Sequence, residues 1–310
     1  TTEGRAIFTA GMTGSVGDSN VLDYVEISTL SNATDFGDLS KVCRFNGAMN
    51  SSTRGVIQLG GQETSSTPLE EIEYVTIASE GNSADFGDAS QTRNNGIMSA
   101  SNATRGINGG GYNLQSASYV AQVDYITIAS QGDGQDFGDL SIARYGVSGL
   151  GSPTRALALG GADSVQGDRS NYIDYRAIAS LGDFVDFGDL NVQRRAMSAA
   201  SNSTRGVVSG SLQASANINS IEYVTIATLG DGQDFGDLVN PSNNGAGAAG
   251  ETRALLVRGN SSGTPNTTTS DIEYITIASL SNSLDFGDLS VAREGFLGQS
   301  IASNHGGLQT

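Results

Sequence analysis

The sequence predicts an all-β fold, a six-bladed propeller with four antiparallel strands in each blade. Three observations predict it: a string repeated six times, two further landmarks in the same phase, and β-type patterning inside each repeat. Successive copies of the string Asp-Phe-Gly-Asp start 50, 51, 50, 48 and 51 residues apart. The six copies begin at Asp35, Asp85, Asp136, Asp186, Asp234 and Asp285. A fixed period of about 50 residues is typical of repeat architectures such as propellers.

Two other landmarks recur once in every repeat. One is an Arg followed by Gly or Ala, at Arg5, Arg54, Arg105, Arg155, Arg205 and Arg253. The other is an acidic residue before Tyr, at Asp23, Glu73, Asp124, Asp174, Glu222 and Glu273. Because all three landmarks keep one phase, the chain is built from six copies of a single unit.

The repeat from Ala143 to Leu190 shows the expected strands in order. Residues 145–151 are small and alternating, and residues 155–161 alternate apolar and small side chains before a Gly-Gly pair. Residues 172–179 form the third run, and a short fourth run ends at the Phe of Asp-Phe-Gly-Asp. The third run is rich in β-branched residues in sibling repeats, and Gly and Ser interrupt any helical period. Each repeat therefore predicts a four-stranded antiparallel sheet.

Ring closure follows from where the repeats begin along the chain. A small sheet cannot bury both of its faces alone, so each sheet must stack on its neighbours. The first repeat begins at Arg5, in the second strand of a blade, and Gly295 to Ser303 resembles the missing first strand. We therefore expect residues 1–310 to form a single propeller domain. Its closing blade combines residues 1–40 with 294–304 and leaves no open sheet edge.

The order of the landmarks resembles the kelch class of propeller blade. A strand that ends in Gly-Gly precedes the strand with the repeat Tyr in three repeats: Gly60 before Tyr74, Gly110 before Tyr125, and Gly160 before Tyr175. The sequence departs from kelch repeats because the Phe of Asp-Phe-Gly-Asp stands where they have Trp, and the other three glycine pairs are degenerate. The resemblance implies a kelch-like fold, without membership of the eukaryotic kelch family.

The repeated residues are expected to build the scaffold. We expect the repeat Tyr and Phe to fill the gaps between blades, and the Gly of the string to lie at a β-bulge or a positive φ. The acidic pair of the string is expected to bind turn amides or the repeat Arg, in a lattice of salt bridges. A ring of calcium sites is the alternative. It is based on acidic stretches such as 133–136 and 231–234, which lack the ligand spacing of a calcium loop.

Composition excludes several classes of function. Acidic residues outnumber basic ones by 33 to 16, which gives a formal net charge of −17. We therefore expect no nucleic-acid partner and no membrane insertion. Cys43 is the only Cys and His305 the only His. These counts argue against disulfide frameworks, thiolate zinc clusters and His-based active sites, so we expect no enzymatic activity, no cofactor and no metal.

Binding chemistry is expected on the loops between the second and third strands of the blades. These loops differ between repeats, whereas the turns between the first and second strands are nearly uniform. Loops displayed by a regular scaffold are where functional variation is expected. Their candidate binding residues are Tyr112, Tyr119, Arg169 and Tyr172, with Arg258 nearby. Ordinary loop residues are the alternative interpretation of all five.

A second resemblance concerns the biological setting. The run IEYVTIAS, a short Gly/Asn/Ser segment, DFGDLS, Ala-Arg, STRG and Gly-Gly is similar to repeats in virion structural proteins of marine tailed bacteriophages, cyanophages included. Residues 72–111 and 272–298 show it best. The resemblance implies a non-enzymatic tail, fibre or capsid-surface component located in the virion. Its partners would be other virion proteins and a host-surface receptor or glycan. Residues 239–245 depart from the pattern, which marks an attachment point or drift.

Two other hypotheses remain open beside the virion component. A lectin-type carbohydrate-binding propeller predicts sugar pockets with aromatic platforms at equivalent places in several blades. A cellular kelch-like adaptor predicts a basic partner, because this chain is acidic.

Overall fold

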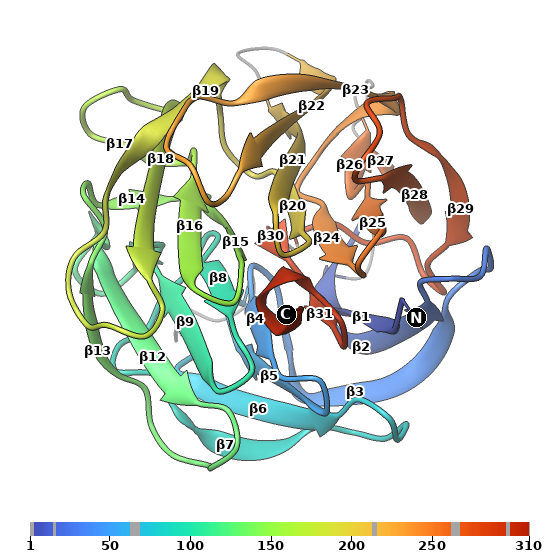
Figure 1. The fold of residues 1–310 in the computed structure, drawn as a ribbon. Coiled ribbons are helices and arrows are strands. Elements are labelled where there is room, and N and C mark those ends of the chain that lie inside the picture. Colours follow the sequence, from blue (N-terminus) through green and yellow to red (C-terminus); the bar gives the residue numbers. More distant parts are fainter. Residues whose placement is uncertain are drawn as a thin grey trace.

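The structure, a computed structural model, is a ring of six blades around a central axis, as Figure 1 shows. It describes residues 3–14, 17–62, 69–212, 216–261, 267–295 and 298–309. We number the blades 1 to 6 by their Asp-Phe-Gly-Asp strings and letter the strands of each blade a to d from the axis to the rim. The all-β, six-bladed fold with four antiparallel strands per blade is confirmed.

Blades 1 to 3 follow this pattern, here from strand a to strand d. Blade 1 contains β31 (Ile301–Ala302), β1 (Arg5–Thr13), β2 (Gly17–Glu26) and β3 (Thr34–Cys43). Blade 2 contains β4 (Gly47–Asn50), β5 (Arg54–Gln58), β6 (Glu71–Thr76) and β7 (Ala84–Asp88). Blade 3 contains β8 (Met98–Ser101), β9 (Arg105–Gly109), β12 (Gln122–Thr127) and β13 (Gln135–Asp139).

Blades 4 to 6 repeat the same order. Blade 4 contains β15 (Ser148–Gly151), β16 (Arg155–Leu159), β18 (Ser170–Ala177) and β19 (Val185–Arg194). Blade 5 contains β20 (Ser198–Ser201), β21 (Arg205–Leu212), β22 (Asn217–Thr225) and β23 (Gln233–Asn243). Blade 6 contains β24 (Ala246–Ala249), β25 (Arg253–Val257), β28 (Asp271–Thr276) and β29 (Leu284–Asp288).

Short strand pairs extend three of the blades beside their b–c loops. β10 (Tyr112–Asn113) pairs with β11 (Ser118–Tyr119) in blade 3, and β14 (Arg144–Tyr145) pairs with β17 (Ala162–Asp163). β26 (Asn260–Ser261) pairs with β27 (Thr267–Thr268) and with the end of β23. The β10–β11 and β14–β17 pairs give regular structure to loops that the sequence alone shows only as variable.

The C-terminal segment closes the ring as predicted, although its strand a is shorter than the expected 295–303. In β31, Ile301 and Ala302 pair antiparallel with Ile7 and Ala6 of β1. Just before it, β30 (Gly298–Gln299) pairs in parallel with the innermost strands of blades 5 and 6. The segment after residue 297 therefore runs along the axis and not only within blade 1.

The Phe of each string is buried between blades, as expected. The six side chains, exposed by 1–3%, are Phe36, Phe86, Phe137, Phe187, Phe235 and Phe286. Phe36 and Leu39 of blade 1 share a buried cluster with Val75 and Ile77 of blade 2. The repeat Tyr of each blade lies edge-on to its Phe, with ring centroids 5.7–6.2 Å apart. Apolar burial of this kind is the main force that holds the blades together.

The repeat Arg residues link each blade to the next. Each guanidinium lies 4.1–4.9 Å from the centroid of its own blade's Tyr, a cation–π contact. Each also donates to an Ile carbonyl in the following blade. These carbonyls belong to Ile77, Ile128, Ile178, Ile226, Ile277 and Ile27. The bond from Arg253 to Ile27, 2.8 Å long, connects blade 6 to blade 1.

The Gly of the string lies at both a bulge and a positive φ, as predicted. In all six blades φ is between +143° and +150°, and the c–d pairing shifts register at this point. The backbone around this Gly binds the c–d loop of the next blade. In blade 1, Phe36 accepts a hydrogen bond from the Gly81 amide (2.7 Å), and the Asp38 amide donates to Asn82 Oδ1 (3.1 Å). The string is thus a connector between blades.

The predicted salt-bridge lattice exists, but the partners we predicted for it are wrong. None of the twelve string carboxylates pairs with a cation among the described residues. Four buried ion pairs join the acid before Tyr to an Arg eight positions after the start of the preceding blade's string. These pairs are Asp124 with Arg93, Asp174 with Arg144, Glu222 with Arg194, and Asp23 with Arg293. All four Arg side chains are fully buried, and burial lowers the pKa of Arg144, Arg194 and Arg293.

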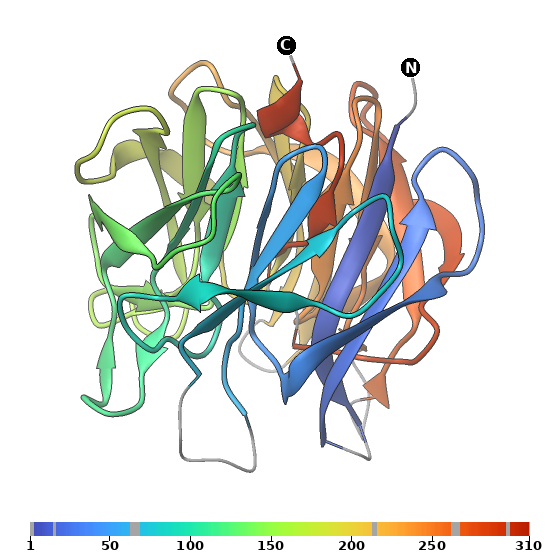
Figure 2. The same ribbon diagram turned by 90° about the horizontal axis from the view of Figure 1, so that it is seen from below.

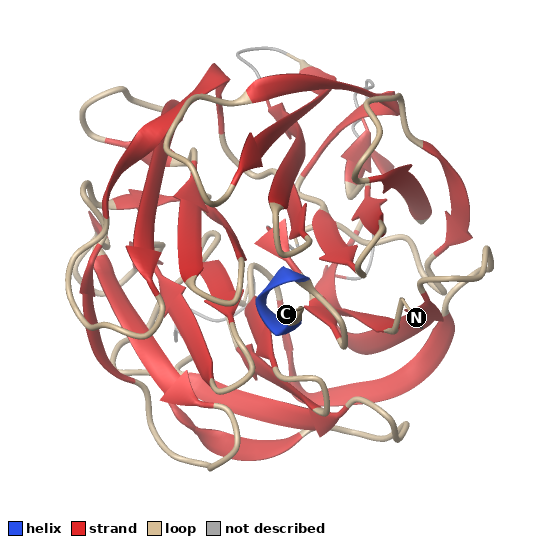
Figure 3. Ribbon diagram, viewed as in Figure 1, coloured by secondary structure: helices blue, strands red, loops and turns tan. Residues whose placement is uncertain are grey.

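The C-terminal turn closes the axis on the face that carries the a–b turns. Figure 2 shows the 3-10 turn η1 (Gly306–Leu308) above this face, and Figure 3 shows it at the centre of the ring. His305 caps the turn: its Nδ1 accepts from the Gly307 amide (3.0 Å), and its Nε2 lies 3.2 Å from the Asn50 carbonyl oxygen. Burial lowers the pKa of His305 to about 4.

Mild acid is therefore expected to weaken the fold through His305. The unfolded chain takes up a proton on this imidazole as the pH falls through about 6.5, whereas the folded chain does so only near pH 4. Stability is thus lost progressively between these values, by at most about 3 kcal/mol. Urea unfolding at several pH values, compared with His305→Gln, measures the effect. Identical pH dependence in both proteins would contradict it.

Candidate functional site

The six d–a loops form a collar around the axis, on the face opposite η1. Ten positions after the start of each string, one residue adopts the left-handed conformation, with φ between +53° and +78°. These collar residues are Phe45, Asn95, Gly146, Ala196, Asn244 and Gly295. The conformation costs a residue with a Cβ about 1–2 kcal/mol. Phe and Ala therefore store strain at this place, and such strain is concentrated at functional sites.

Backbone hydrogen bonds connect the collar from loop to loop. The amides of Phe45, Gly146, Ala196, Asn244 and Gly295 each donate to a collar carbonyl of the preceding loop, over 2.6–3.0 Å. The sixth link is different, because the Asn95 amide donates to Oδ1 of Asn94 (2.6 Å). The collar is therefore interrupted at one place, between the Phe45 loop, which joins blades 1 and 2, and the Asn95 loop, which joins blades 2 and 3.

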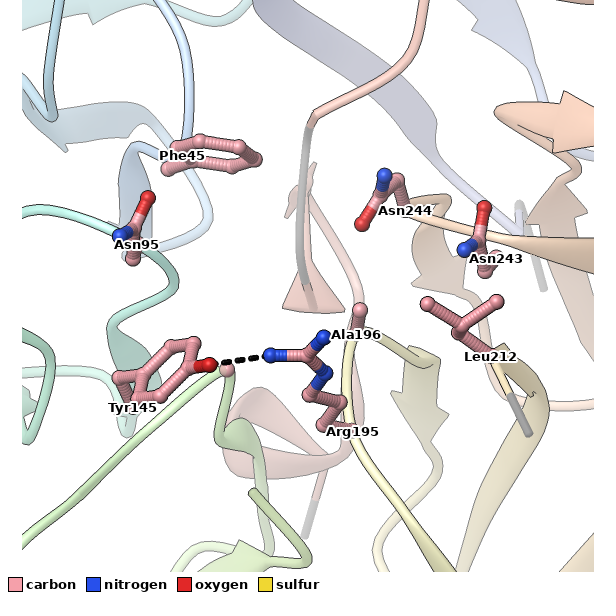
Figure 4. Close-up of a pocket in the computed structure, with 9 residues that line it drawn as sticks. Phe45, Asn95, Tyr145, Arg195, Ala196, Leu212, Asn243 and Asn244 are labelled. Carbon is pink, nitrogen blue, oxygen red and sulfur yellow. Dashed lines mark hydrogen bonds between the residues drawn. The ribbon is translucent and has the colours of Figure 1, made fainter. Parts of the chain in front are cut away.

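A pocket of ≈ 270 Å³ opens inside this collar. Its described lining is Phe45, Asn95, Tyr145, Gly146, Arg195, Ala196, Leu212, Asn243 and Asn244. Figure 4 shows their side chains arranged around the opening, with Asn95 and Asn243 on opposite sides. We call it the mouth pocket, because it lies where the central channel meets the face of the d–a and b–c loops.

The residue just before each collar residue gives the mouth its chemistry. At these six equivalent positions stand two Arg, two Asn, one Tyr and one Glu: Arg44, Arg195, Asn94, Asn243, Tyr145 and Glu294. One position earlier, the buried Arg of the lattice keeps four of the six loops alike. The buried residue below the mouth is thus the same in four of the six loops, whereas the residue at the rim of the mouth differs from loop to loop.

A chain of polar contacts runs from the mouth pocket toward the b–c loop of blade 4. The Arg195 guanidinium donates to the Tyr145 hydroxyl and pairs with Asp168 Oδ1 at 3.0 Å. Asp168 also pairs with Arg169 through its other oxygen, at 2.9 Å. Burial raises the pKa of Tyr145, although Arg195 opposes the shift. Tyr145 is therefore a neutral phenol, held in place by a guanidinium that is already paired.

Three tyrosines form a cluster beside the pocket. The ring centroid of Tyr145 lies 5.3 Å from that of Tyr119 and 6.4 Å from that of Tyr112, and the last two are 5.9 Å apart. Tyr119 is exposed, and the other two are half-buried. The β10–β11 hairpin holds two of the rings against the third. This arrangement provides an aromatic platform that leads into the pocket.

Two amides at the mouth have no partner in the part of the chain that the structure describes. Asn243 is 7% exposed, and its Oδ1 forms no hydrogen bond there. The side chain of Asn95 likewise makes no bond to a described residue. A buried polar atom without a partner costs about 1–3 kcal/mol. Asn244, in contrast, donates to Glu294 Oε2 at 3.1 Å. Of the two side chains, Asn243 has the buried oxygen without a partner, and Asn95 is half-buried at the opening of the pocket.

The structure brings three of the five sequence-predicted site residues together. Tyr112 and Tyr119 form the platform, and Arg169 joins it through Asp168. Tyr172 is half-buried against the lattice, 5.7 Å from the Arg144 guanidinium.

Arg258 does not belong to the b–c surface, which corrects its place among the candidate binding residues. Its side chain is buried, donates to Asp271, and lies 3.6 Å from Glu273. Ser242 of blade 5 and Cys43 of blade 1 stand where the other four lattice positions have Arg, and Arg258 supplies the positive charge that Ser242 does not offer to Glu273. The departure at residues 239–245 therefore has a structural compensation within blade 6.

The residues of the mouth pocket lie outside the b–c loops, where the sequence predicts binding chemistry. Tyr145, Arg195, Asn95 and Asn243 lie in d–a loops of only a few residues. The signal that could have found them is the ninth and tenth positions after the start of each string, where the side chains change from blade to blade.

Two further observations concern other classes of site. Within the described ranges, no three His, Cys, Asp or Glu side chains gather in a way that could hold a metal ion. No helix of the described chain has the length and apolar character needed to cross a membrane.

The comparisons with protein-family models and with curated proteins gave no match. No model of a known protein family matches the chain. No curated protein matches it either. The fold and the mouth pocket must therefore support any functional proposal on their own chemistry, together with the two resemblances of the repeat.

Proposed function

We propose that this chain is a non-enzymatic structural protein of a phage virion, a tail, fibre or capsid-surface component. It would bind a host-surface receptor or glycan at the mouth pocket and other virion proteins on the opposite face. One observation supports recognition at the mouth: the rim of a six-fold repeated scaffold carries different side chains at equivalent positions. A regular scaffold with a non-uniform rim is the usual construction of a binding surface.

The virion setting is supported by the repeat string. The succession IEYVTIAS, DFGDLS and STRG is similar to repeats of marine phage virion proteins, and the order of Gly-Gly and Tyr supports kelch-like blades. No catalytic residues come with either resemblance. The proposal is therefore limited to binding, and it requires only the side chains that line the mouth pocket.

The opposite face offers apolar side chains for contact with other virion proteins. Four c–d loops expose a Leu by 53–58% at equivalent positions, namely Leu30, Leu181, Leu229 and Leu280. Glu80 and Gln131 stand there in blades 2 and 3. Exposed Leu side chains repeated around this face would offer apolar contacts to a protein partner. The propeller would thus attach through this face and display the mouth.

Particle composition tests the virion setting. Particles of the phage that encodes this chain are purified and examined by mass spectrometry and immunogold electron microscopy. We expect the chain to be present on the particle surface at a fixed stoichiometry. Infectious particles without the chain would contradict the proposal.

Adsorption to host cells tests recognition at the mouth. Arg195→Ala removes the contacts to Tyr145 and Asp168, and we expect the adsorption rate constant to fall about tenfold. The matched control is Arg176→Ala, because Arg176 donates to c–d loop carbonyls on the opposite face. Equal adsorption by both variants, at equal incorporation into particles, would exclude the mouth as the recognition site.

A lectin-type propeller that acts outside a virion is the second candidate. The platform of Tyr112, Tyr119 and Tyr145 favours it, because sugar rings stack on aromatic side chains. The lectin hypothesis predicts such platforms in several blades. Among the described residues, the three-tyrosine platform occurs beside blade 3 alone. This single platform, in place of the several that the lectin hypothesis predicts, favours one binding site per propeller.

A further inference from the structure

We propose that the mouth pocket binds a single uncharged sugar ring, the terminal residue of a neutral glycan. The ring would be held by the amides of Asn95 and Asn243 and by the rings of Phe45 and Tyr145. This inference rests on the proposed recognition function and names the ligand class of the same site.

The hydrogen-bonding capacity of the mouth matches hydroxyl groups. A side-chain amide both donates and accepts, and a sugar hydroxyl does the same. Asn243 is buried with its Oδ1 unpartnered within the described chain, and Asn95 lies across the opening with no side-chain bond to a described residue. Each amide can therefore engage a pair of neighbouring hydroxyls. A purely apolar ligand would leave both amides unsatisfied.

The charges at the mouth favour a neutral ligand over an anionic one. Arg195 is the one charged side chain in the described lining of the pocket, and Asp168 already neutralises it at 3.0 Å. Glu294 is committed to the amides of Asn244 and Asn260, at 3.1 Å and 2.9 Å. The net charge of −17 repels anions in addition. A sialic acid or a sulfated sugar would therefore find no unpaired cation in this lining.

The volume and the walls of the pocket favour one ring. Pockets for drug-sized molecules measure roughly 300–1,000 Å³, and this pocket is smaller, at ≈ 270 Å³. Phe45 and Tyr145 supply aromatic walls for the C–H faces of a pyranose. Tyr119, 5.3 Å from Tyr145, lies outside the pocket where a second ring of the glycan would rest.

Saturation-transfer NMR and calorimetry with the full chain test the proposal. The probes are the methyl glycosides of glucose, galactose, mannose and N-acetylglucosamine, with the methyl glycoside of sialic acid as the anionic counterpart. We expect at least one neutral glycoside to bind with millimolar affinity and the sialoside at least about tenfold more weakly. Absence of binding by all four neutral glycosides, or tighter binding of the sialoside, overturns the proposal.

Three variants locate the binding. Asn243→Ala and Asn95→Ala are each expected to weaken binding of the neutral glycoside about tenfold. Asn171→Ala is the matched control, because Asn171 lies in β18 outside the lining of the pocket. Thermal unfolding confirms that each variant is folded. An equal loss in Asn171→Ala, or no loss in both pocket variants, places the sugar elsewhere and overturns the proposal.

The proposed sugar binding and the proposed virion function can be contradicted separately. If no neutral sugar binds but Arg195→Ala still lowers adsorption, the mouth recognises another ligand, such as a peptide, and only the ligand class is wrong. If a neutral sugar binds at Asn243 but particles lack the chain, the site stands and the virion setting is wrong.

Discussion

Replacement of Asp23 by Asn is expected to lower the free energy of unfolding by about 3–5 kcal/mol. Asp23 belongs to blade 1 and pairs with Arg293 of blade 6 at 2.5 Å, and neither side chain is exposed. Burial lowers the pKa of Arg293, and the Asp23 carboxylate opposes this shift. Without the carboxylate, the buried guanidinium loses the counter-charge that Asp23 supplies. The ion pair also lies at the closure of the ring, so its loss weakens the junction of first and last blades.

An exposed carboxylate of the repeated string is the matched control. Asp35→Asn makes the same chemical change, but Asp35 is exposed and forms no ion pair with a described residue. We expect its free energy of unfolding to change by less than about 0.5 kcal/mol. Chemical denaturation of both variants measures the difference. Equal small effects would show that the buried lattice contributes little to stability.

Replacement of Gly87 by Ala is expected to destabilise the fold by about 2–5 kcal/mol, because strain and collision add. Gly87 lies at φ +150°, and a Cβ there would stand 2.6 Å from the carbonyl group of Gly132 in blade 3. That carbonyl belongs to a c–d loop that the Phe86 and Asp88 backbone binds. The loop cannot retreat without breaking these hydrogen bonds between blades 2 and 3.

Gly132→Ala separates the two contributions. Gly132 has nearly the same conformation, with φ +153°, but nothing lies within 4 Å of its Cβ position. Its substitution measures the backbone strain alone, about 1–3 kcal/mol. The additional loss in Gly87→Ala is the cost of the collision between blades. Equal midpoints of thermal unfolding for the two variants would contradict the role of the string as a connector.

The two predictions explain why the repeated string persists. The string was expected to act through its carboxylates, yet its essential atoms are the backbone around Gly and the buried Phe ring. The aspartates of the string lie mostly at the surface, where they raise the negative charge of the chain without pairing. The net charge is therefore partly a consequence of the scaffold and says less about partners than its size suggests.

Sequence reasoning singled out two of the three tyrosines of the platform, but none of the residues that line the pocket. Tyr112, Tyr119 and Arg169 were found because variable loops stand out against uniform turns. Tyr145 and Arg195 were not found, because they follow directly after buried lattice residues and look like parts of the repeat. Arg258 was wrongly placed near the b–c surface. Nothing in the sequence indicates that it replaces the lattice Arg that blade 5 lacks at Ser242.

The sequence by itself determined the number of blades, the order of their strands and the closure of the ring. These properties depend on the period of the repeat and on local β patterning, and both are visible in the order of residues along the chain. Only the tertiary structure decided which acid meets which Arg, how five of six collar loops bond to one another, and where a cavity remains. These depend on contacts between residues about 30 to 270 positions apart, whose distances follow from the packing of whole blades. The mouth pocket exists because six non-identical loops meet at one axis, and no single repeat contains that information.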